Sequence, residues 1–324
     1  MVGIRAEELL DHYQLEQLVA RSGMASIFRA TDIRTGRPVA IKLPHPHIEA
    51  DAAMYDRFQR ESEIGQRLNH PGVMKVYGEP DRTRVYMVME WLDGRLLRQA
   101  LHDARKFTHE RAIRITVAIC DVLDYIHRNG VAHRDLKPEN IMLDCQDRPK
   151  LIDFGIASLS GARRLTFGKF SQLMGTPEYI APEQVQGKRG DGRSDIYALG
   201  VMLYEMVSGK TPFEGPTALA VMNSRVANSP IPPREANPEI SSQLQEVLYR
   251  ALERDPQKRY STAAEFAWDL THLEQVEPRE RPELRGWTRP RGRWLRRALF
   301  GVVMGLIPVI VFSAIFWLLS FTKR

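Results

Sequence analysis

The first ninety residues alternate short apolar segments with polar ones, a pattern that predicts β-strands interrupted by one helical segment. Residues 85–89 form a continuous uncharged run, Val-Tyr-Met-Val-Met, which is typical of a buried strand. In the helical segment, four residues recur at spacings of four, seven and three and therefore lie on one apolar face: Met54, Phe58, Gly65 and Leu68. We therefore expect residues 11–92 to form a small strand-rich lobe with one helix.

From Thr108 onward the apolar positions follow a helical period instead. Ile115, Ile119, Val122 and Ile126 define one face of a helix that Asn129 and Gly130 end. A second helix is predicted to start at Ser194, and residues 196–207 are apolar almost all round, as in a helix at the centre of a helical lobe. Residues 93–276 are thus expected to form a larger helical lobe, which gives an α+β fold of two lobes.

The last segment has a different pattern, because residues 298–322 contain no charged side chain. A helix of this length rises about 35 Å, enough to cross the hydrocarbon core of a membrane. Pro308 lies at mid-span, where membrane helices tolerate a kink, and Trp294 and Trp317 lie near the two ends. We expect a transmembrane helix here, with a buried core helix as the alternative. Residues 277–297, rich in Arg, Pro and Gly, are expected to be an extended linker before the membrane.

Charge is distributed unevenly between this tail and the rest of the chain. Ten of the 46 basic residues and two of the 40 acidic ones lie in residues 279–324, which therefore carry +8, while residues 1–278 carry −2. Because the basic residues are concentrated in the tail, the charge of the remaining residues does not indicate a catalytic surface that binds nucleic acid. Eight arginines precede the apolar segment, and two basic residues follow it, so the positive-inside rule predicts a cytoplasmic catalytic region. The two cysteines do not form a disulfide framework, which favours a reducing compartment.

The first candidate functional residue is Lys42, which ends the strand-like run Val-Ala-Ile-Lys. Alternation along this run places Lys42 near the interior. A buried lysine needs a negative partner. Glu61 follows Phe58 by three residues on the apolar face of the next helix, whereas Glu63 is two positions away and points elsewhere. We therefore predict that Lys42 pairs with Glu61, the alternative being two unrelated surface charges.

Two further segments carry the residue types that phosphoryl transfer requires. Residues 133–140 read His-Arg-Asp-Leu-Lys-Pro-Glu-Asn, and residues 153–155 read Asp-Phe-Gly. Asn140 and Asp153 offer the oxygen ligands that Mg²⁺ prefers. Asp135 has the chemistry to accept or orient a hydroxyl proton, and Lys137 can neutralise a γ-phosphate. These residues point to an ATP-dependent phosphotransferase.

The ordered set of motifs resembles the eukaryotic-like protein kinase family, and within it the bacterial Ser/Thr kinases. The resemblance covers residues 13–273. Besides the segments already quoted, it includes Gly-Thr-Pro-Glu-Tyr-Ile-Ala-Pro-Glu at 175–183, Ser-Asp-Ile-Tyr at 194–197 and Asp-Pro-Gln-Lys-Arg-Tyr at 255–260. It implies the two-lobed protein kinase fold, with ATP and Mg²⁺, or Mn²⁺ in its place, as cofactors.

The resemblance also assigns roles to single residues. Asp135, Lys137, Lys42 and Glu61 match the catalytic set, and Met89 matches the gatekeeper before a hinge at 90–92. Glu183 and Arg259 match a buried ion pair, and Asp195 matches the residue that steadies the catalytic loop. The nucleotide is expected to contact Ala20, Ser22, Gly23, Ala25, Ile27, Ala40, Lys42, Met89, Glu90, Leu92, Asn140, Met142 and Asp153.

One element departs from the family pattern. The family's phosphate-covering loop has three glycines, and the matching positions here are Ala20, Ser22 and Ala25, with Gly23 as an extra glycine. Glycines let a backbone approach phosphates closely, so we expect a stiffer loop that binds ATP less well. The departure favours an inactive, membrane-anchored pseudokinase scaffold, whereas the complete catalytic set favours an active enzyme.

The resemblance also bears on substrate and regulation. Residues 136–140 resemble the Ser/Thr branch, and residues 175–183 resemble a peptide-docking platform, which disfavours a small-molecule phosphotransferase. Arg134 matches an arginine that receives a phosphate from the activation segment, residues 153–183, and this implies autophosphorylation. The expected sites are Thr166 and Ser171, with Ser158 and Ser160 as weaker candidates, whereas Thr176 is expected to be structural.

The apolar tail allows two further expectations. Gly301 and Gly305 form a G-x-x-x-G pair that can bring two helices together in a homodimer, the alternative being an anchor only. The arginines before the helix either lie on anionic lipid or act only as a topology signal. From the family branch we expect a single-pass protein of a bacterial inner membrane.

Overall fold

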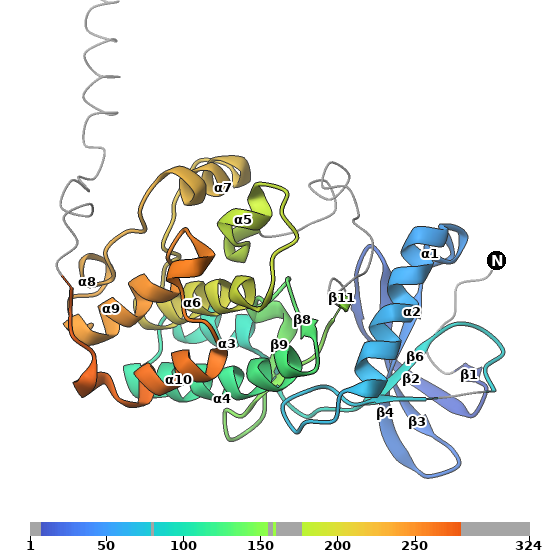
Figure 1. Cartoon of the computed structure of the whole chain (residues 1–324). Helices are drawn as coiled ribbons and strands as arrows, with labels where there is room; N and C mark the ends of the chain where they lie inside the picture. Colours follow the sequence, from blue (N-terminus) through green and yellow to red (C-terminus); the bar gives the residue numbers. More distant parts are fainter. Residues whose placement is uncertain (1–7, 79–80, 155–157, 160–176, 280–324) are drawn as a thin grey trace, which may run out of the picture. The chain divides into compact units, whose positions relative to one another are not determined.

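The computed structural model describes residues 8–78, 81–154, 158–159 and 177–279 (Figure 1). Several expected features lie outside these residues: the linker beyond Arg279, the transmembrane helix expected at 298–322 with its Gly301/Gly305 pair, Ser160, Thr166, Ser171 and Thr176. Within the described residues, no helix combines the length and apolarity needed to cross a membrane.

The N-terminal lobe is built on one antiparallel sheet with strand order β1-β2-β3-β4-β6-β5. Its strands are β1 Leu9–Leu10, β2 Tyr13–Arg21, β3 Ala25–Asp32, β4 Arg37–Pro44, β5 Val76–Tyr77 and β6 Met87–Glu90. Two apolar clusters lie on the two faces of the sheet. Val39, Ile41 and Leu43 of β4 belong to one cluster, and Ala40 belongs to the other, as alternation along a strand requires.

The lobe contains two helices, α1 Pro46–Ala50 and α2 Ala52–Arg67, rather than the single helix predicted. Pro46 at the first position starts α1, because its fixed φ suits a helix and its missing N–H has no partner there anyway. Asp51 then caps α2, accepting hydrogen bonds from the N–H groups of Ala53 (3.0 Å) and Met54 (3.2 Å). Sequence periodicity missed α1 because five residues are too few to show a helical repeat.

The second lobe is mainly helical, as expected. Its helices are α3 Leu97–Ala104, α4 His109–Arg128, α5 Pro182–Val185, α6 Gly192–Ser208, α7 Ala218–Ala227, α8 Pro233–Ala236, α9 Ser242–Ala251 and α10 Ala263–Thr271. Its short strands are β7 Arg95–Leu96, β8 Val131–Ala132, β9 Ile141–Leu143, β10 Pro149–Leu151 and β11 Ser158–Leu159. The described residues of this lobe also contain four 3-10 helices: η1 Pro138–Asn140, η3 Pro177–Tyr179, η4 Pro256–Lys258 and η5 Leu273–Gln275.

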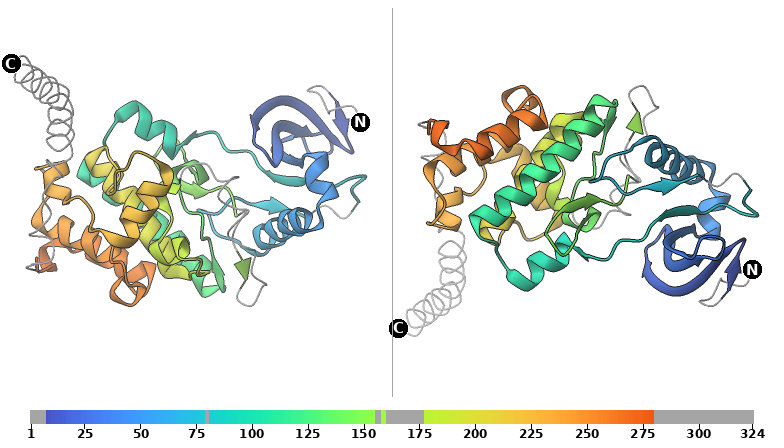
Figure 2. Two further views of the ribbon diagram at one scale, coloured as in Figure 1. Left: turned by 90° about the horizontal axis from the view of Figure 1, so that it is seen from above. Right: turned by 90° about the horizontal axis from the view of Figure 1, so that it is seen from below.

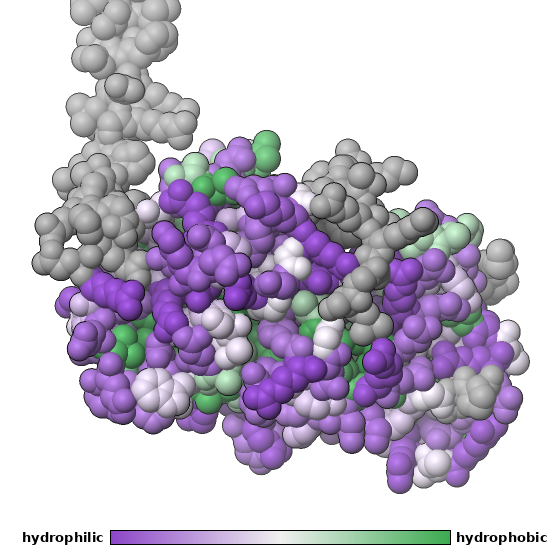
Figure 3. Space-filling model, viewed as in Figure 1, coloured by the Kyte–Doolittle hydropathy of each residue, from purple (hydrophilic) through white to green (hydrophobic). Residues whose placement is uncertain are grey.

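Helices α4 and α6 form the centre of this lobe and pack against each other, and α4 is the long green helix at the front of the right-hand view of Figure 2. As predicted, α4 ends before Asn129 and Gly130, where Gly130 has a φ of 74°. Helix α6 is buried along nearly its whole length, as its uninterrupted apolar sequence predicted. It begins at Gly192 and not at Ser194, because Asp191 caps it by accepting a hydrogen bond from the N–H of Arg193 (2.8 Å). The face of the molecule in Figure 3 is largely hydrophilic over the described residues.

Candidate active site

Lys42 lies on β4, on the face of the sheet that α2 covers. Ala40, two residues earlier on the same face, packs in one cluster with Phe58 of α2. The ammonium nitrogen of Lys42 lies 2.5 Å from Oε1 of Glu61 and 3.5 Å from Oδ1 of Asp153. The predicted Lys42–Glu61 pair is therefore present, and a second carboxylate, 111 residues away in sequence, shares the same lysine.

Close packing fixes the position of α2 and hence of Glu61. Glu61 is buried with Phe58 and Ile64 on one face of the helix, whereas Glu63 is exposed, as predicted. A Cβ on Gly65 would lie 2.3 Å from the side chain of Val76, so only glycine lets α2 approach β5 this closely. The missing side chain at Gly65 thus determines how far Glu61 reaches toward Lys42.

The charges in this cluster are strongly coupled. Burial alone would lower the pKa of Lys42, but the carboxylates of Asp153 and Glu61 outweigh it and raise that pKa. Burial and the nearby Asp153 carboxylate raise the pKa of Glu61, against the opposing effect of Lys42. Lys42 thus lies between two carboxyl groups, and the partly exposed Asp153 offers the oxygen ligands that a divalent cation prefers.

The segment between β8 and β9 gathers the other predicted polar residues. The ammonium nitrogen of Lys137 lies 2.7 Å from Oδ2 of Asp135. Asn140 donates from Nδ2 to the backbone carbonyl of Asp135 (2.8 Å), which leaves its side-chain oxygen as an acceptor. The N–H of Ile152 donates to the carbonyl of Asn140 (3.0 Å), which brings Asn140 next to the strand that leads into Asp153. Amide and carboxylate oxygens at these two positions fit the ligand preference of Mg²⁺.

Asp195 holds the backbone just before Asp135. Its carboxylate is fully buried and accepts hydrogen bonds from the N–H groups of His133 (2.9 Å) and Arg134 (2.6 Å). Arg134 has a φ of 65°, a left-handed conformation that a non-glycine residue adopts at a cost. Burial would raise the pKa of Asp195, but the hydrogen bonds from His127 and the backbone prevail and lower it. The ionised carboxylate therefore maintains a strained turn that aims Asp135.

Four of the residues expected to contact the nucleotide lie in or against one apolar cluster. Met89 and Ala40 are buried and directly opposite each other on β6 and β4, and Ile27 and Leu92 pack against the same cluster. Glu90, in the expected hinge, is fixed because its Oε1 accepts from the backbone N–H of Lys75 and from Nζ of Lys150, both at 2.7 Å.

Met142, the remaining apolar candidate, lies on β9 opposite Lys150 of β10.

The loop with the altered glycine pattern is the turn between β2 and β3. Ala20 pairs with Ile27, and Arg21 ends β2 opposite Ser26; Ser22, Gly23 and Met24 form the turn before Ala25. No residue of this turn has a left-handed φ, and a Cβ on Gly23 would meet nothing within 4 Å. The backbone seen here is therefore one that Ala and Ser adopt without strain, which explains how the turn dispenses with the family's glycines.

The ion pair expected in the helical lobe is also present. Arg259 donates to both carboxylate oxygens of Glu183 at 2.9 and 2.7 Å, and both residues are buried. Ser194 adds a hydrogen bond to the same carboxylate (2.7 Å). The pair joins α5 to the segment before α10, so it stabilises the region that follows residues 175–183.

Sequence reasoning missed two residues that the fold brings to this site. Arg57 lies one turn before Glu61 on α2, and the charges of Glu61 and Asp135 act on it, although burial dominates and lowers its pKa. Its spacing of four residues from Glu61 was a usable signal. His127 lies 2.8 Å from Oδ2 of Asp195, a contact between residues 68 positions apart that no local pattern announces.

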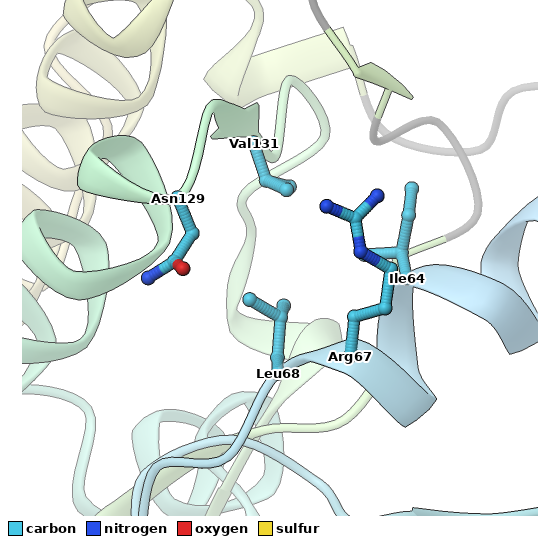
Figure 4. Close-up of a pocket in the computed structure, with 5 residues that line it drawn as sticks. All are labelled: Ile64, Arg67, Leu68, Asn129 and Val131. Atoms are coloured by element: carbon cyan, nitrogen blue, oxygen red, sulfur yellow. The ribbon is translucent and has the colours of Figure 1, made fainter.

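A small cavity of about 70 Å³ lies between the end of α2, the end of α4 and β8 (Figure 4). Arg67 and Asn129 provide its polar lining, and Ile64, Leu68 and Val131 its apolar lining. None of the residues predicted to bind the nucleotide lines it, so it is separate from the cluster around Lys42.

Comparison with known proteins defines the class. A family model described as protein kinase domain matches residues 13–269, so the chain belongs to the protein kinase family and carries its two-lobed fold. The relatives named here are bacterial. The serine/threonine-protein kinase PknB of Mycobacterium tuberculosis (strain H37Rv) is 37% identical over 281 residues, which are 85% of this chain and 45% of that protein.

Two further proteins extend the comparison. The probable serine/threonine-protein kinase SCO3848 of Streptomyces coelicolor is 38% identical over 263 residues, 80% of this chain and 39% of that protein. The crystal structure of the Mycobacterium tuberculosis PknI kinase domain has a TM-score of 0.65 and 26% identity, covering 84% of this chain and 100% of that one. The chain spans less than half the length of these curated relatives.

Proposed function

We propose that this protein is an active Ser/Thr protein kinase that transfers the γ-phosphate of ATP to protein hydroxyl groups. The observation that carries the proposal is the connected set around Lys42, in which one ammonium group contacts both Glu61 and Asp153. A pseudokinase that only recruits a partner has no need to maintain this buried charge cluster, which is costly to assemble.

Each polar residue has a role in the proposed reaction. Lys42, held by Glu61, orients the α- and β-phosphate oxygens. Asp135 orients the substrate hydroxyl and accepts its proton, while that oxygen bonds to the γ-phosphorus and the bond to the β-phosphate oxygen breaks. Lys137, already 2.7 Å from Asp135, neutralises charge on the transferring group.

Asn140 and Asp153 are the residues that would hold Mg²⁺, or Mn²⁺ in its place. When bound, the ion neutralises charge on the phosphates. The carboxylate of Asp153 and the side-chain oxygen that Asn140 keeps as an acceptor support this assignment.

Protein Ser and Thr residues are the proposed substrates, because the relatives carry the name serine/threonine-protein kinase. Arg225 supports a peptide-docking role for the region after residue 176. It is buried on α7 and donates to the backbone carbonyls of Ile180 (2.7 Å) and Glu178, which holds this segment in a defined shape. A small-molecule phosphotransferase would show turnover of a metabolite without protein labelling.

The full-length protein, purified in a mild detergent and incubated with Mg-ATP and a generic protein substrate, tests the proposal by phosphosite mass spectrometry. Glu61→Gln and Glu63→Gln form a matched pair on one helix, because only Glu61 contacts Lys42. We expect Glu61→Gln and Asp153→Ala to lose at least about a hundredfold in kcat/KM, and Glu63→Gln to match the wild type. Absence of phosphoserine and phosphothreonine from folded wild-type protein would favour the pseudokinase.

Autophosphorylation within residues 153–183 is the proposed activation step, with Thr166 and Ser171 as the preferred sites. Two basic residues support it: Arg134 directly precedes Asp135, and Arg57 lies near Glu61 and Asp135. Phosphopeptide mapping of fully active enzyme tests it. A segment without modification in that enzyme would contradict the proposal.

We also propose that residues 298–322 tether the kinase to a bacterial inner membrane, with the catalytic region in the cytoplasm. The uncharged run and the eight preceding arginines support this topology. Fractionation of cells that express the full chain, beside a chain ending at residue 297, tests it. Recovery of both proteins in the soluble fraction would contradict the tether.

Pairing of two such helices through Gly301 and Gly305 would give a homodimer. Unchanged self-association of the Gly301→Leu, Gly305→Leu double variant in detergent would contradict it.

A further inference from the structure

The turn between β2 and β3 contains two N–H groups that converge on one point. The N–H groups of Met24 and Ala25 both donate to the side-chain oxygen of Ser22, at 3.2 and 3.1 Å. Ser22 also closes the turn through its backbone N–H, which donates to the carbonyl of Ala25 (2.9 Å). The turn thus places one neutral oxygen where two adjacent amides are aimed.

The segment around α1 determines the direction of these amides. Nε2 of His47 donates to the carbonyl of Gly23 (3.0 Å), and the N–H of His45 donates to the carbonyl of Met24 (2.9 Å). These peptide bonds are trans, and in a trans peptide the C=O and the following N–H point in opposite directions. Because the two carbonyls are drawn toward the histidines, the N–H groups of Met24 and Ala25 must face the other way, toward Ser22.

The hydroxyl of Ser26 reinforces this arrangement. It lies 3.0 Å from Nε2 of His45, so the segment at the start of α1 contacts β3 as well as the turn. The turn also lies close in register to the expected phosphate-binding lysine, because Ile27 is paired with Lys42 across β3 and β4.

Adjacent backbone N–H groups that converge in a turn form an anion-binding concavity. We propose that the hydroxyl of Ser22 holds the place of an ATP phosphate oxygen, and that His47 is a positioning residue that keeps the two amides aimed at it. This inference rests on the proposed kinase function. It explains why Ser at a position where the family has glycine is compatible with nucleotide binding: the hydroxyl satisfies the amides until phosphate displaces it.

The proposal predicts opposite effects for one substitution in the turn and one in α1. Ser22→Ala removes the competing oxygen and should lower the Kd of a nucleotide by about three- to tenfold, the range for one or two exposed hydrogen bonds. His47→Ala frees the Gly23 carbonyl and should raise that Kd by about three- to tenfold. His47→Gln keeps a side-chain N–H at similar reach and should restore wild-type affinity.

A matched control exists in the neighbouring hairpin. Thr35 closes the turn between β3 and β4 by donating to Asp32 (2.7 Å), so Thr35→Ala removes a turn hydroxyl far from Lys42 in register. It should leave nucleotide affinity unchanged.

Isothermal titration of the full-length protein in detergent, with the non-hydrolysable analogue AMPPNP plus Mg²⁺ and separately with adenosine, tests the inference. We expect the Ser22 and His47 variants to change the Kd of AMPPNP in opposite directions and to leave that of adenosine within about twofold, because adenosine has no phosphate. Weaker AMPPNP binding by Ser22→Ala, or equal changes for adenosine, would overturn it.

Lys42→Met separates this inference from the proposed function. If Lys42→Met weakens AMPPNP binding while the Ser22 and His47 variants do not differ from wild type, only the assignment of the turn fails. If Lys42→Met also leaves AMPPNP affinity unchanged, the nucleotide site itself is wrong and both proposals fail.

Discussion

Asp195→Asn tests whether a buried carboxylate in α6 controls the position of the catalytic loop. The substitution keeps the size of the side chain but replaces one of its two acceptor oxygens with an NH₂ group. In the native protein these oxygens accept from the N–H groups of His133 and Arg134 and lie 2.8 Å from Nε2 of His127. Asn cannot accept all three, so at least one buried donor faces another donor.

The expected magnitude follows from these contacts. Losing one hydrogen bond to a charged group and leaving a buried N–H without an acceptor should lower the free energy of unfolding by about 2–4 kcal/mol. Without its hydrogen bond to Asp195, Arg134 also loses what holds its left-handed φ of 65°. Relaxation of that turn moves Asp135, and a displacement of about 1 Å at a reacting group can lower kcat by about a hundredfold.

The assay combines urea unfolding of the full-length protein, followed by circular dichroism, with steady-state phosphate transfer. Asp191→Asn is the matched control, because Asp191 caps the same helix and asparagine caps equally well. It should change unfolding by less than about 0.5 kcal/mol and kcat by less than about twofold. The reasoning is refuted if Asp195→Asn unfolds at the wild-type urea concentration and keeps a kcat within about threefold of wild type.

Three further predictions concern stability and the position of α2. Arg259→Leu should lower the free energy of unfolding by about 3–5 kcal/mol, because it leaves Glu183 buried without its cation. Arg250 is half-exposed, so Arg250→Leu should lower it by about 1 kcal/mol or less. Equal losses in urea unfolding would contradict this prediction. Burial opposes ionisation of Glu183, but Arg259 prevails and lowers its pKa, so its stabilisation is present above the ordinary Glu pKa and is lost as the pH falls through the lowered one. Glu183→Gln should remove that part of the acid dependence of unfolding, and an unchanged pH profile would contradict it. Gly65→Ala should push α2 away from Val76 and lower kcat/KM by about tenfold or more. Wild-type kcat/KM in this variant would contradict the prediction.

Local periodicity predicted the elements that carry the site. The alternation through Val39 to Lys42 placed the lysine near the interior, and the helical spacing from Phe58 placed Glu61 on the apolar face of the next helix, which predicted the pair that the structure contains. The end of α4 at Asn129 and the burial of α6 were confirmed for the same reason. Each of these predictions needed only side-chain direction along one element, which the backbone period fixes.

Predictions failed where the deciding feature was a cap or a very short element. Helix α1 was missed, and the start of α6 was placed two residues late, because Pro46 and Asp191 act through single positions and not through a repeat. The contact of His127 with Asp195 could not be predicted, because it joins residues of two helices whose packing no local pattern specifies.

The sequence by itself determined the order of motifs, the residue types available for phosphoryl transfer, and the pairing of Lys42 with Glu61. Only the tertiary structure decided that Asp153 joins this pair and that His45 and His47 face the turn around Ser22. The physical reason is one of range. Side-chain direction within an element follows from its backbone period, whereas contacts between elements depend on how closely they pack, which positions such as Gly65 set through the absence of a side chain.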